Sequence, residues 1–338
     1  MSNFSEIIKN LNKKPPRSRN DNVLVIDCLN TFMRNFVMVK SLNSKGQHVG
    51  GVVGFLRSLG LLVRVKNPTR VICVFDGLGG SMSRKNMDSN YKAQRNTTRI
   101  TKWGMYESLQ EERESISAQI TRLMDYLETL PVDIVIVEKV EADDVISFIA
   151  EGFSRSNHKV TIVSTDKDFF QIIKDNVEVY NPISKKTFTK DNIKKAIGTS
   201  AENYLIMKAL VGDSSDNLRG IQRLGPKNLI KYFPILNEEN ITLQHIYDIA
   251  EQNIDSNKMY AKVIDDWELV ETNYKIMNLQ EFFLDESQKR SIVDQLKIST
   301  VRLNIGGFLH FLEQDLVDGI TTNTEAWLYE FKYLTALT

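Results

Sequence analysis

The sequence predicts an α/β fold with a mostly parallel central sheet flanked by helices. Short apolar runs rich in β-branched residues alternate with segments of helical periodicity, the order typical of a doubly wound sheet. Four runs are expected to be strands: 23–26, 71–75, 134–137 and 160–163. Each leads into acidic residues, and open α/β sheets bind their ligands at the carboxyl ends of the strands. Acids from separate strands are therefore expected to converge.

Helices are expected between and after these strands. A first helix is expected within 30–40, and Gly50-Gly51 opens a second that runs to about residue 66. Residues 107–130 predict a long amphipathic helix, because apolar side chains recur along one face. Further helices are expected at 141–149, 204–211 and 227–233. Residues 241–338 have helical periodicity but no motif tied to chemistry, which predicts a stabilising C-terminal helical subdomain.

The bulk composition is that of a globular protein and gives no sign of a polyanionic partner. The 43 basic and 43 acidic residues give a net charge of zero, so any basic surface must be local. Cys28 and Cys73 lie in apolar strand-like runs and are expected to be reduced core thiols in the cytoplasm. The most apolar stretch, 50–65, is broken by Arg57 and Arg64, which argues against a membrane span. Residues 1–20 are expected to be a flexible basic extension without a signal peptide.

The acidic residues at the strand ends carry the strongest functional signal. The candidate metal ligands are Asp27, Asp76, Glu141, Asp143, Asp144, Asp166, Asp168, Asp213 and Asp216. So many carboxylates at one crevice would repel one another unless cations neutralised them. Magnesium prefers oxygen ligands, and two ions about 4 Å apart can activate a water and stabilise a leaving oxygen. Any one aspartate alone would be read as a turn former or helix cap, but acids after four strands favour a metal site.

A glycine-punctuated segment at 212–227 places Asp213 and Asp216 before a turn that leads into a helix bearing Lys227. Glycines there let the backbone approach a phosphate, and free helix N–H groups favour an anion. A surface helical hairpin would explain the glycines but not the pair of aspartates.

A second basic segment reads Tyr91-Lys92-Ala93-Gln94-Arg95. A helix would put Tyr91 and Arg95 on one face. Lys92 and Arg95 would then face a phosphate, and Tyr91 would stack on a base. Taken alone, the segment is equally typical of a solvated charged helix.

Together these motifs resemble the 5′-nuclease (flap endonuclease) superfamily, particularly its bacteriophage and bacterial branch. The resemblance spans roughly residues 21–235. It rests on Val25-Ile26-Asp27 with Arg34 downstream, Phe75-Asp76-Gly77, Tyr91-Lys92, Glu141-Ala142-Asp143-Asp144, Thr165-Asp166-Lys167-Asp168, and Gly212-Asp213 through Lys227. It implies a PIN-like nuclease core at 21–205 with a helical arch at about 80–130. A helix–three-turn–helix at 206–240 and the C-terminal helical region at 241–338 would follow.

The resemblance also implies roles for individual residues. The first metal group would be Asp27, acting through water, with Asp76, Glu141 and Asp143, and Asp144 beside them. The second would be Asp166, Asp168 and Asp213, supported by Asp216. Lys92 and Arg95 would contact the scissile phosphate from the arch, and Arg34 would lie near the site. The implied DNA-binding residues are Tyr91, Arg84, Lys85, Gly220, Arg223, Gly225 and Lys227.

The implied activity is hydrolysis of phosphodiesters at 5′ ends, flaps or RNA primers on duplex DNA during replication. Two Mg²⁺ ions would serve the reaction, with Mn²⁺ as a substitute. The family often holds K⁺ at the helix–three-turn–helix, but Arg223 stands where glycine is usual, which weakens the case for potassium here. The expected partners are branched or 5′-ended duplex DNA, RNA–DNA hybrids, and replication proteins such as a single-strand binding protein or clamp. The expected setting is a monomer in the cytoplasm of a phage-infected bacterium.

Three alternatives remain open at this point. A structure-specific DNA-binding protein with an inactive centre would keep the fold without cleavage. A PIN-like ribonuclease shares the acidic sheet edge but usually lacks the segment 213–227. A phosphatase would need neither the arch nor the hairpin segment.

Overall fold

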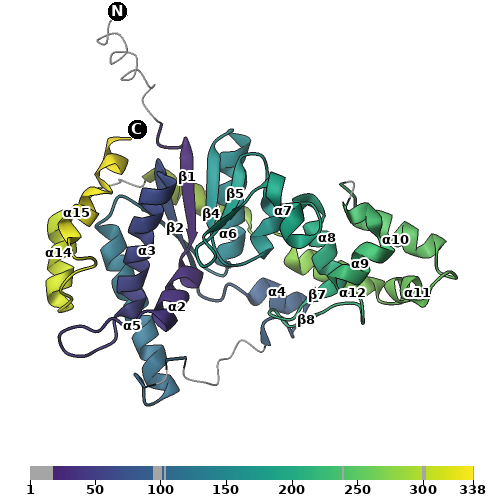
Figure 1. Cartoon of the computed structure of the whole chain (residues 1–338), viewed down its shortest axis with the longest axis horizontal. Coiled ribbons are helices and arrows are strands. Elements are labelled where there is room, and N and C mark those ends of the chain that lie inside the picture. The colour runs from purple at the N-terminus through teal and green to yellow at the C-terminus, as the bar shows by residue number, and fades with distance from the viewer. Residues whose placement is uncertain (1–17, 94–100, 103, 238–239, 299–301, 338) are drawn as a thin grey trace, which may run out of the picture.

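The central feature of the molecule is a six-stranded sheet in the order β3-β2-β1-β4-β5-β6 (Figure 1). The computed structural model describes residues 18–93, 101–102, 104–237, 240–298 and 302–337. The strands are β1 Asn22–Asp27, β2 Arg70–Asp76, β3 Asp133–Val137, β4 Lys159–Val163, β5 Val177–Asn181 and β6 Lys186–Phe188. All pairs are parallel except β5–β6. The predicted α/β class with a mostly parallel sheet is confirmed.

The order of the strands changes direction at β1. The chain lays β2 and β3 on one side of β1 and then returns to lay β4 and β5 on the other. Such a switch leaves a crevice at the carboxyl ends of the two central strands. Asp27 is the last residue of β1 and Asp76 the last of β2, while β4 runs into the segment that carries Asp166. The topology therefore brings the predicted acids to one edge.

Helices cover both faces of the sheet. Because side chains alternate along a strand, Val23 and Val25 enter one core while Leu24 and Ile26 enter the other. Burial on both faces explains why the strands read as continuous apolar runs. The Leu24 core is formed with α2 Cys28–Met38, α3 Gly50–Lys66 and α5 Leu109–Glu128. The Val25 core is formed with α6 Ala142–Arg155, α8 Ala201–Val211 and α9 Pro226–Tyr232. The helices predicted before residue 240 are all present, with α6 longer than expected.

The C-terminal helices do not gather into the single subdomain expected from the sequence. The helices α10 Leu243–Gln252, α11 Lys258–Asp265 and α12 Trp267–Met277 pack into the Val25 core. The helices α14 Ile305–Gln314 and α15 Thr324–Tyr329 pack into the Leu24 core. Between them, α13 Glu286–Ile298 lies beside β3. Figure 1 shows the two groups at opposite ends of the molecule. Apolar faces of the C-terminal segment thus complete both cores.

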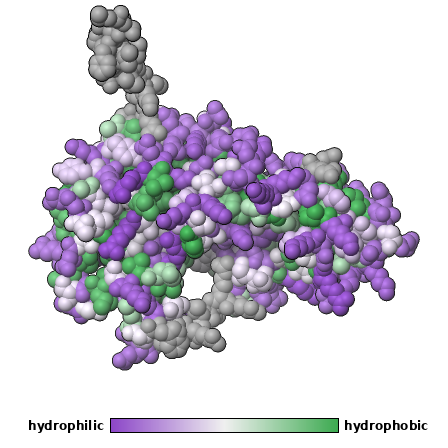
Figure 2. Space-filling view, viewed as in Figure 1, coloured by the Kyte–Doolittle hydropathy of each residue, from purple (hydrophilic) through white to green (hydrophobic). Residues whose placement is uncertain are grey.

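Shorter elements connect these layers. They are α4 Met82–Met87, α7 Lys190–Ile197, the two-stranded ribbon β7 Gly212–Asp213 and β8 Leu218–Arg219, and the 3₁₀ turns η2 Asp168–Ile172, η3 Pro234–Asn237 and η4 Lys332–Ala336. Polar side chains cover most of the face in Figure 2, with apolar residues in small groups. Across the described ranges, no helix combines the length and apolarity needed to cross a membrane. Cys28 and Cys73 are both buried free thiols.

Candidate active site

Asp27 lies at the centre of the sheet edge. Its carboxylate caps α2 by accepting a hydrogen bond from the Asn30 backbone N–H at 3.1 Å. The Ser164 hydroxyl, at the end of β4, donates to the other oxygen at 2.9 Å. Burial raises the pKa of Asp27 to about 7, the two hydrogen bonds oppose the rise, and the charges of Asp76 and Asp166 add to it. Neighbouring strands have therefore brought at least three carboxylates into electrostatic contact.

The N-terminus of α6 adds a second set of acids. Asp76 accepts a hydrogen bond from the Ala142 N–H at 2.9 Å, which joins the end of β2 to the first turn of this helix. Asp143 follows in the same turn. Burial raises the pKa of Asp143 well above its usual range, and the charges of Asp166 and Asp27 raise it further. Asp27, Asp76, Asp143 and Asp166 thus form one acidic group, and a cation placed among them would relieve their repulsion.

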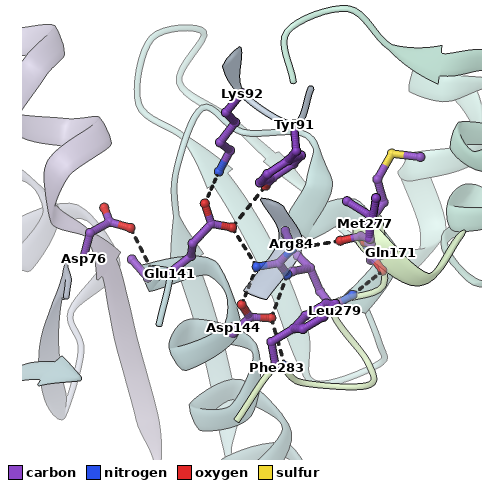
Figure 3. Close-up of polar contacts among 12 residues, drawn as sticks. Asp76, Arg84, Tyr91, Lys92, Glu141, Asp144, Gln171, Met277, Leu279 and Phe283 are labelled. Atoms are coloured by element: carbon purple, nitrogen blue, oxygen red, sulfur yellow. Dashed lines mark hydrogen bonds and ion pairs between the residues drawn. The ribbon is translucent and has the colours of Figure 1, made fainter. Parts of the chain in front are cut away.

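Glu141 differs because basic and hydroxyl groups surround it (Figure 3). Its Oε1 lies 2.5 Å from Lys92 Nζ. Its Oε2 accepts hydrogen bonds from Arg84 Nη1 at 2.6 Å and from the Tyr91 hydroxyl at 3.1 Å. Burial alone would raise the pKa of Glu141, but the charges of Lys92 and Arg84 outweigh burial and lower it. Glu141 is therefore held ionised and fixed in orientation.

A further acidic group lies beside η2 and β7. One carboxylate oxygen from each of Asp168, Asp213 and Asp216 falls within 4.8 Å of the others. The ammonium of Lys208, on α8, donates to Asp168 and also to Asp213 at 2.6 Å. Burial raises the pKa of Asp168 to about 6, with Lys208 opposing the rise. For Asp213 the same lysine and Ser215 outweigh burial, and the pKa falls to about 2.

The donor set of both groups suits a hard divalent cation. The ligands that these acids offer are carboxylate oxygens, which Mg²⁺, Mn²⁺ and Ca²⁺ prefer. Carboxylate oxygens as close as those of Asp168, Asp213 and Asp216 can share one ion. The oxygens of Asp168, Asp213 and Asp216 therefore fit one metal position, and the group at Asp27 supplies further carboxylates nearby.

Comparison with known proteins shows the family of the chain. Residues 22–198 match the family described as "5′-3′ exonuclease, N-terminal resolvase-like domain", and the match covers more than half of the 338 residues. The chain belongs to this 5′-3′ exonuclease family. The predicted membership in the 5′-nuclease superfamily is confirmed.

Two curated relatives each share sequence with more than half of the chain. A 5′-3′ exonuclease of Aquifex aeolicus is 32% identical over 207 residues, which are 61% of this chain and 66% of that protein. DNA polymerase I of Borreliella burgdorferi is 27% identical over 268 residues, which are 77% of this chain and 28% of the polymerase. The chain thus spans less than two thirds of the length of either protein.

Solved structures share the fold. The bacteriophage T5 D15 protein co-crystallised with metal ions superposes with a TM-score of 0.61 at 19% identity, covering 87% of this chain and 98% of that one. The catalytic core of Rad2 in complex with a DNA substrate gives a TM-score of 0.56 at 16% identity, with 98% of both chains covered. The PIN-like fold expected from the sequence agrees with both.

Three residues expected to meet metal or DNA are turned inward in this member of the 5′-3′ exonuclease family. Arg84 is only 3% exposed and forms ion pairs with Glu141 and Asp144, so its expected contact with DNA is wrong for this conformation. Tyr91 is 3% exposed with its ring in the Val25 core, so it is not placed to stack on a base. Asp144 is fully buried, and both its oxygens face Arg84. These three side chains lie in the interior of the protein beneath the site and support it.

The described part of the segment, as far as residue 93, turns at Lys92 and does not form the helix considered for residues 91–95. Lys92 has a φ of +54°, which breaks helical geometry. Its backbone N–H donates to the Asp216 carbonyl at 2.8 Å, and the Asn217 side chain donates to the Asn90 carbonyl at 3.0 Å. Arg95 lies outside the described residues. Lys92 is thereby held between the two acidic groups.

The remaining predicted site residues, which are Arg34 and those of the glycine-rich segment 212–227, differ in burial and packing. Arg34 lies half-buried on α2, and its Nη1 is buried without a hydrogen-bond partner among the described residues. A Cβ on Gly220 would lie 1.9 Å from the Val211 carbonyl oxygen, so this glycine is required by close packing. Gly225 caps α9 in open space. The exposed basic residues expected to bind DNA are Lys85, Arg223 and Lys227.

Several residues of the site were missed by sequence reasoning. Lys208 interrupts the apolar run from Leu205 to Val211 in α8, and a lysine on a buried helix is a signal that could have been read. Ser164 and Asn30 orient the acids, but serine and asparagine at strand and helix ends are too common to single out. Gln171 connects η2 to the C-terminal segment and carries no motif.

Proposed function

We propose that the chain is a divalent-metal-dependent 5′-nuclease that hydrolyses phosphodiesters at 5′ ends, flaps or RNA primers on duplex DNA. Mg²⁺ would be the natural ion, with two ions bound. The family membership supports a nuclease, and the acids support the metal dependence.

One observation carries the proposal. Acids at the ends of β1 and β2 and at the start of α6 are linked through the charge of Asp166 to a second group on η2 and the β7–β8 ribbon. Lys92 lies between the two groups, bonded to Glu141 by its side chain and to Asp216 by its backbone. Bound divalent ions supply water activation and charge stabilisation in phosphodiester hydrolysis. A lysine at that place can stabilise charge on the phosphate. The same role is proposed for Arg95, and a supporting role for Arg34.

The assigned metal ligands keep the two sets that the family resemblance implies, although the charge of Asp166 also acts on Asp27 and Asp143 of the first set. The first would be Asp27, Asp76, Glu141 and Asp143, and the second Asp166, Asp168, Asp213 and Asp216. Asp144 is left out of the ligands because Arg84 occupies both of its oxygens.

Duplex DNA would be bound through phosphates. Lys85, Arg223 and Lys227 are exposed basic residues outside the acidic groups, and phosphate contacts of this kind are sequence-tolerant and weakened by salt. The Rad2 core of the same fold is described in complex with a DNA substrate, which supports DNA as the ligand. A replication role and replication-protein partners belong to the proposal as well.

The test is cleavage of a fluorescent 5′-flap duplex in Mg²⁺ or in EDTA, with a single strand and an RNA of the same sequence as controls. Magnesium-dependent products near the junction support the proposal, and their sizes separate flap cutting from stepwise trimming. Tight binding without cleavage would indicate an inactive binding module. Preferential cleavage of the RNA would favour the ribonuclease alternative. Release of a terminal phosphate without any cleavage of the strand would favour the phosphatase alternative.

Asp166→Asn tests the site itself. It should abolish cleavage and leave duplex binding in EDTA nearly unchanged. Cleavage that survives this change would show that the acids at the sheet edge are not the catalytic centre.

A further inference from the structure

Arg84 is the most fully engaged buried cation near the proposed site. It lies on α4 and is 3% exposed. Its Nη1 lies 2.6 Å from Glu141 Oε2 and 2.6 Å from Asp144 Oδ2, and its Nη2 lies 2.8 Å from Asp144 Oδ1. A guanidinium is suited to this task because its planar fork can bond two carboxylates at once.

The third side of the guanidinium faces the C-terminal part of the chain. Arg84 Nε donates at 2.8 Å to the carbonyl of Ile276, in the last turn of α12, and the ring of Phe283 lies 4.4 Å from its central carbon. The segment from Ile276 to Leu284 is fixed again by Gln171, which donates to the Met277 carbonyl and accepts from the Leu279 N–H (Figure 3). We call residues 276–284 the strap. The strap lies outside the 22–198 range that matches the family.

We propose that Arg84 is a positioning residue that holds Glu141 in place for metal binding, with Asp144 as its charge partner and the strap as its support. The inference rests on the proposed function, since it takes Glu141 as a metal ligand. Arg84 would touch neither metal nor DNA. Its work is to fix one oxygen of Glu141 so that the other remains turned toward Lys92 and the crevice.

Charge balance supports this assignment. Glu141 and Asp144 bring two negative charges into a buried region, and Arg84 with Lys92 brings two positive charges. Asp144 is fully buried, and both of its carboxylate oxygens accept hydrogen bonds from Arg84. Asp144 therefore serves as the counter-ion of Arg84 and not as a metal ligand. A neutral side chain at position 84 would leave a buried carboxylate without its cation, which is costly.

The test measures metal binding without DNA and DNA binding without metal, on the whole chain. Calorimetric titration of Mn²⁺ into wild type and Arg84→Lys gives the first. Fluorescence anisotropy of a labelled flap duplex in EDTA gives the second. Lysine keeps the charge, but its three donors lie on one nitrogen and cannot reproduce the four bonds that the guanidinium makes to Glu141, Asp144 and Ile276. We expect Mn²⁺ binding to weaken by about ten to a hundredfold, as when other supports of metal ligands are lost, with DNA affinity unchanged.

Lys85→Gln is the matched contrast, because Lys85 is the exposed neighbour on the same helix. It should weaken DNA binding in EDTA and leave Mn²⁺ affinity unchanged, the reverse of Arg84→Lys. The inference is overturned if Arg84→Lys leaves Mn²⁺ affinity as in wild type, or if it weakens DNA binding as much as Lys85→Gln does.

A double-mutant cycle guards against a general loss of structure. Asp144→Asn keeps Arg84 and its bond to Glu141, so this variant should fold even if Arg84→Lys does not. Like Arg84→Lys, it should bind Mn²⁺ more weakly than the wild-type protein does. If the pair acts as one unit, the double variant loses no more than Arg84→Lys alone. Fully additive losses would make Asp144 a separate ligand and overturn the inference. If the wild-type protein binds no Mn²⁺, the proposed function is wrong. If the wild-type protein and Arg84→Lys bind Mn²⁺ equally well, only this inference is wrong.

Discussion

The ammonium group of Lys92 lies 2.5 Å from Oε1 of Glu141, so the lysine expected to contact a phosphate contacts one of the proposed metal ligands. The two partners come from distant parts of the chain, a turn after α4 and the N-cap of α6. A cation bound at Glu141 would therefore compete with the Lys92 ammonium for the same carboxylate. Binding of metal would turn the lysine toward the substrate.

Replacing Lys92 with methionine should separate metal binding from cleavage. Loss of a competing ammonium should tighten Mn²⁺ binding to the free protein, whereas cleavage should fall by about a hundredfold or more as charge stabilisation is lost. Calorimetry and single-turnover cleavage of the flap duplex measure the two effects. Lys186→Met, at an exposed position of β6, is the control and should change neither. Weaker Mn²⁺ binding in Lys92→Met would contradict the competition.

Lys208→Met should destabilise the protein in a way that divalent metal repairs. Lys208 is buried and donates to Asp168 and Asp213, so its removal leaves two carboxylates facing each other. Breaking a buried ion pair from one side costs about 3 kcal/mol, and a cation shared by the two acids should restore most of it. Urea unfolding in EDTA and in Mg²⁺, at matched ionic strength, measures the difference. An equal loss in both buffers would show that no metal binds between these acids.

The stability of the protein in EDTA should fall as the pH rises toward neutral. The pKa values of Asp27 and Asp168 are raised to about 7 and about 6, so the folded chain keeps protons that the unfolded chain has lost above about pH 4. Between about pH 4 and 7 the folded state binds more protons, and the free energy of unfolding therefore decreases with pH. Saturating Mg²⁺ should remove this slope or reverse it. Denaturant titrations across this range test the sign, and a rise in stability with pH in EDTA would refute it.

Arg223→Gly should stabilise the fold and lower the affinity for DNA. Arg223 has a φ of +71° in an exposed turn, a conformation that costs a side-chain-bearing residue about 1 kcal/mol. Glycine removes that strain, and if Arg223 contacts a phosphate the slope of log affinity against log salt should become shallower by about one. Lys227→Gln is the comparison, with a similar change of slope and no gain in stability. Unchanged salt dependence in Arg223→Gly would remove Arg223 from the DNA surface.

The sheet and its acidic edge were predictable because their signals are local. A parallel strand buried on both faces is written as an apolar run, and Asp27 and Asp76 end such runs directly. Six of the helices before residue 240 were expected from the sequence as well, but α4 and α7 were not.

The surroundings of the acids were not predictable, because they depend on contacts distant in sequence. Arg84 meets Ile276 across 192 positions, and nothing in the local sequence distinguishes it from the exposed Lys85 beside it. Tyr91 was expected to stack on a base because aromatic and basic residues alternate there. Tertiary packing placed its ring in a core instead. Composition near a site predicts charge, but burial decides whether that charge binds a ligand or supports a neighbour.

The last hundred residues pass from one face of the sheet to the other around its open edge. Along the way, the Gln295 side chain accepts a hydrogen bond from the Ile136 N–H and donates one to the Ile136 carbonyl. It thereby pairs backbone groups on the edge of β3 that a further strand would otherwise pair. Beyond that point Trp327 packs so tightly on α3 that a Cβ on Gly60 would lie 1.9 Å from the indole nitrogen. A fragment cut after α9 would therefore bare two apolar faces and an unpaired strand together. Such a fragment should self-associate through that strand, and expression of the chain only as far as Tyr232 should yield more aggregate than expression of all 338 residues.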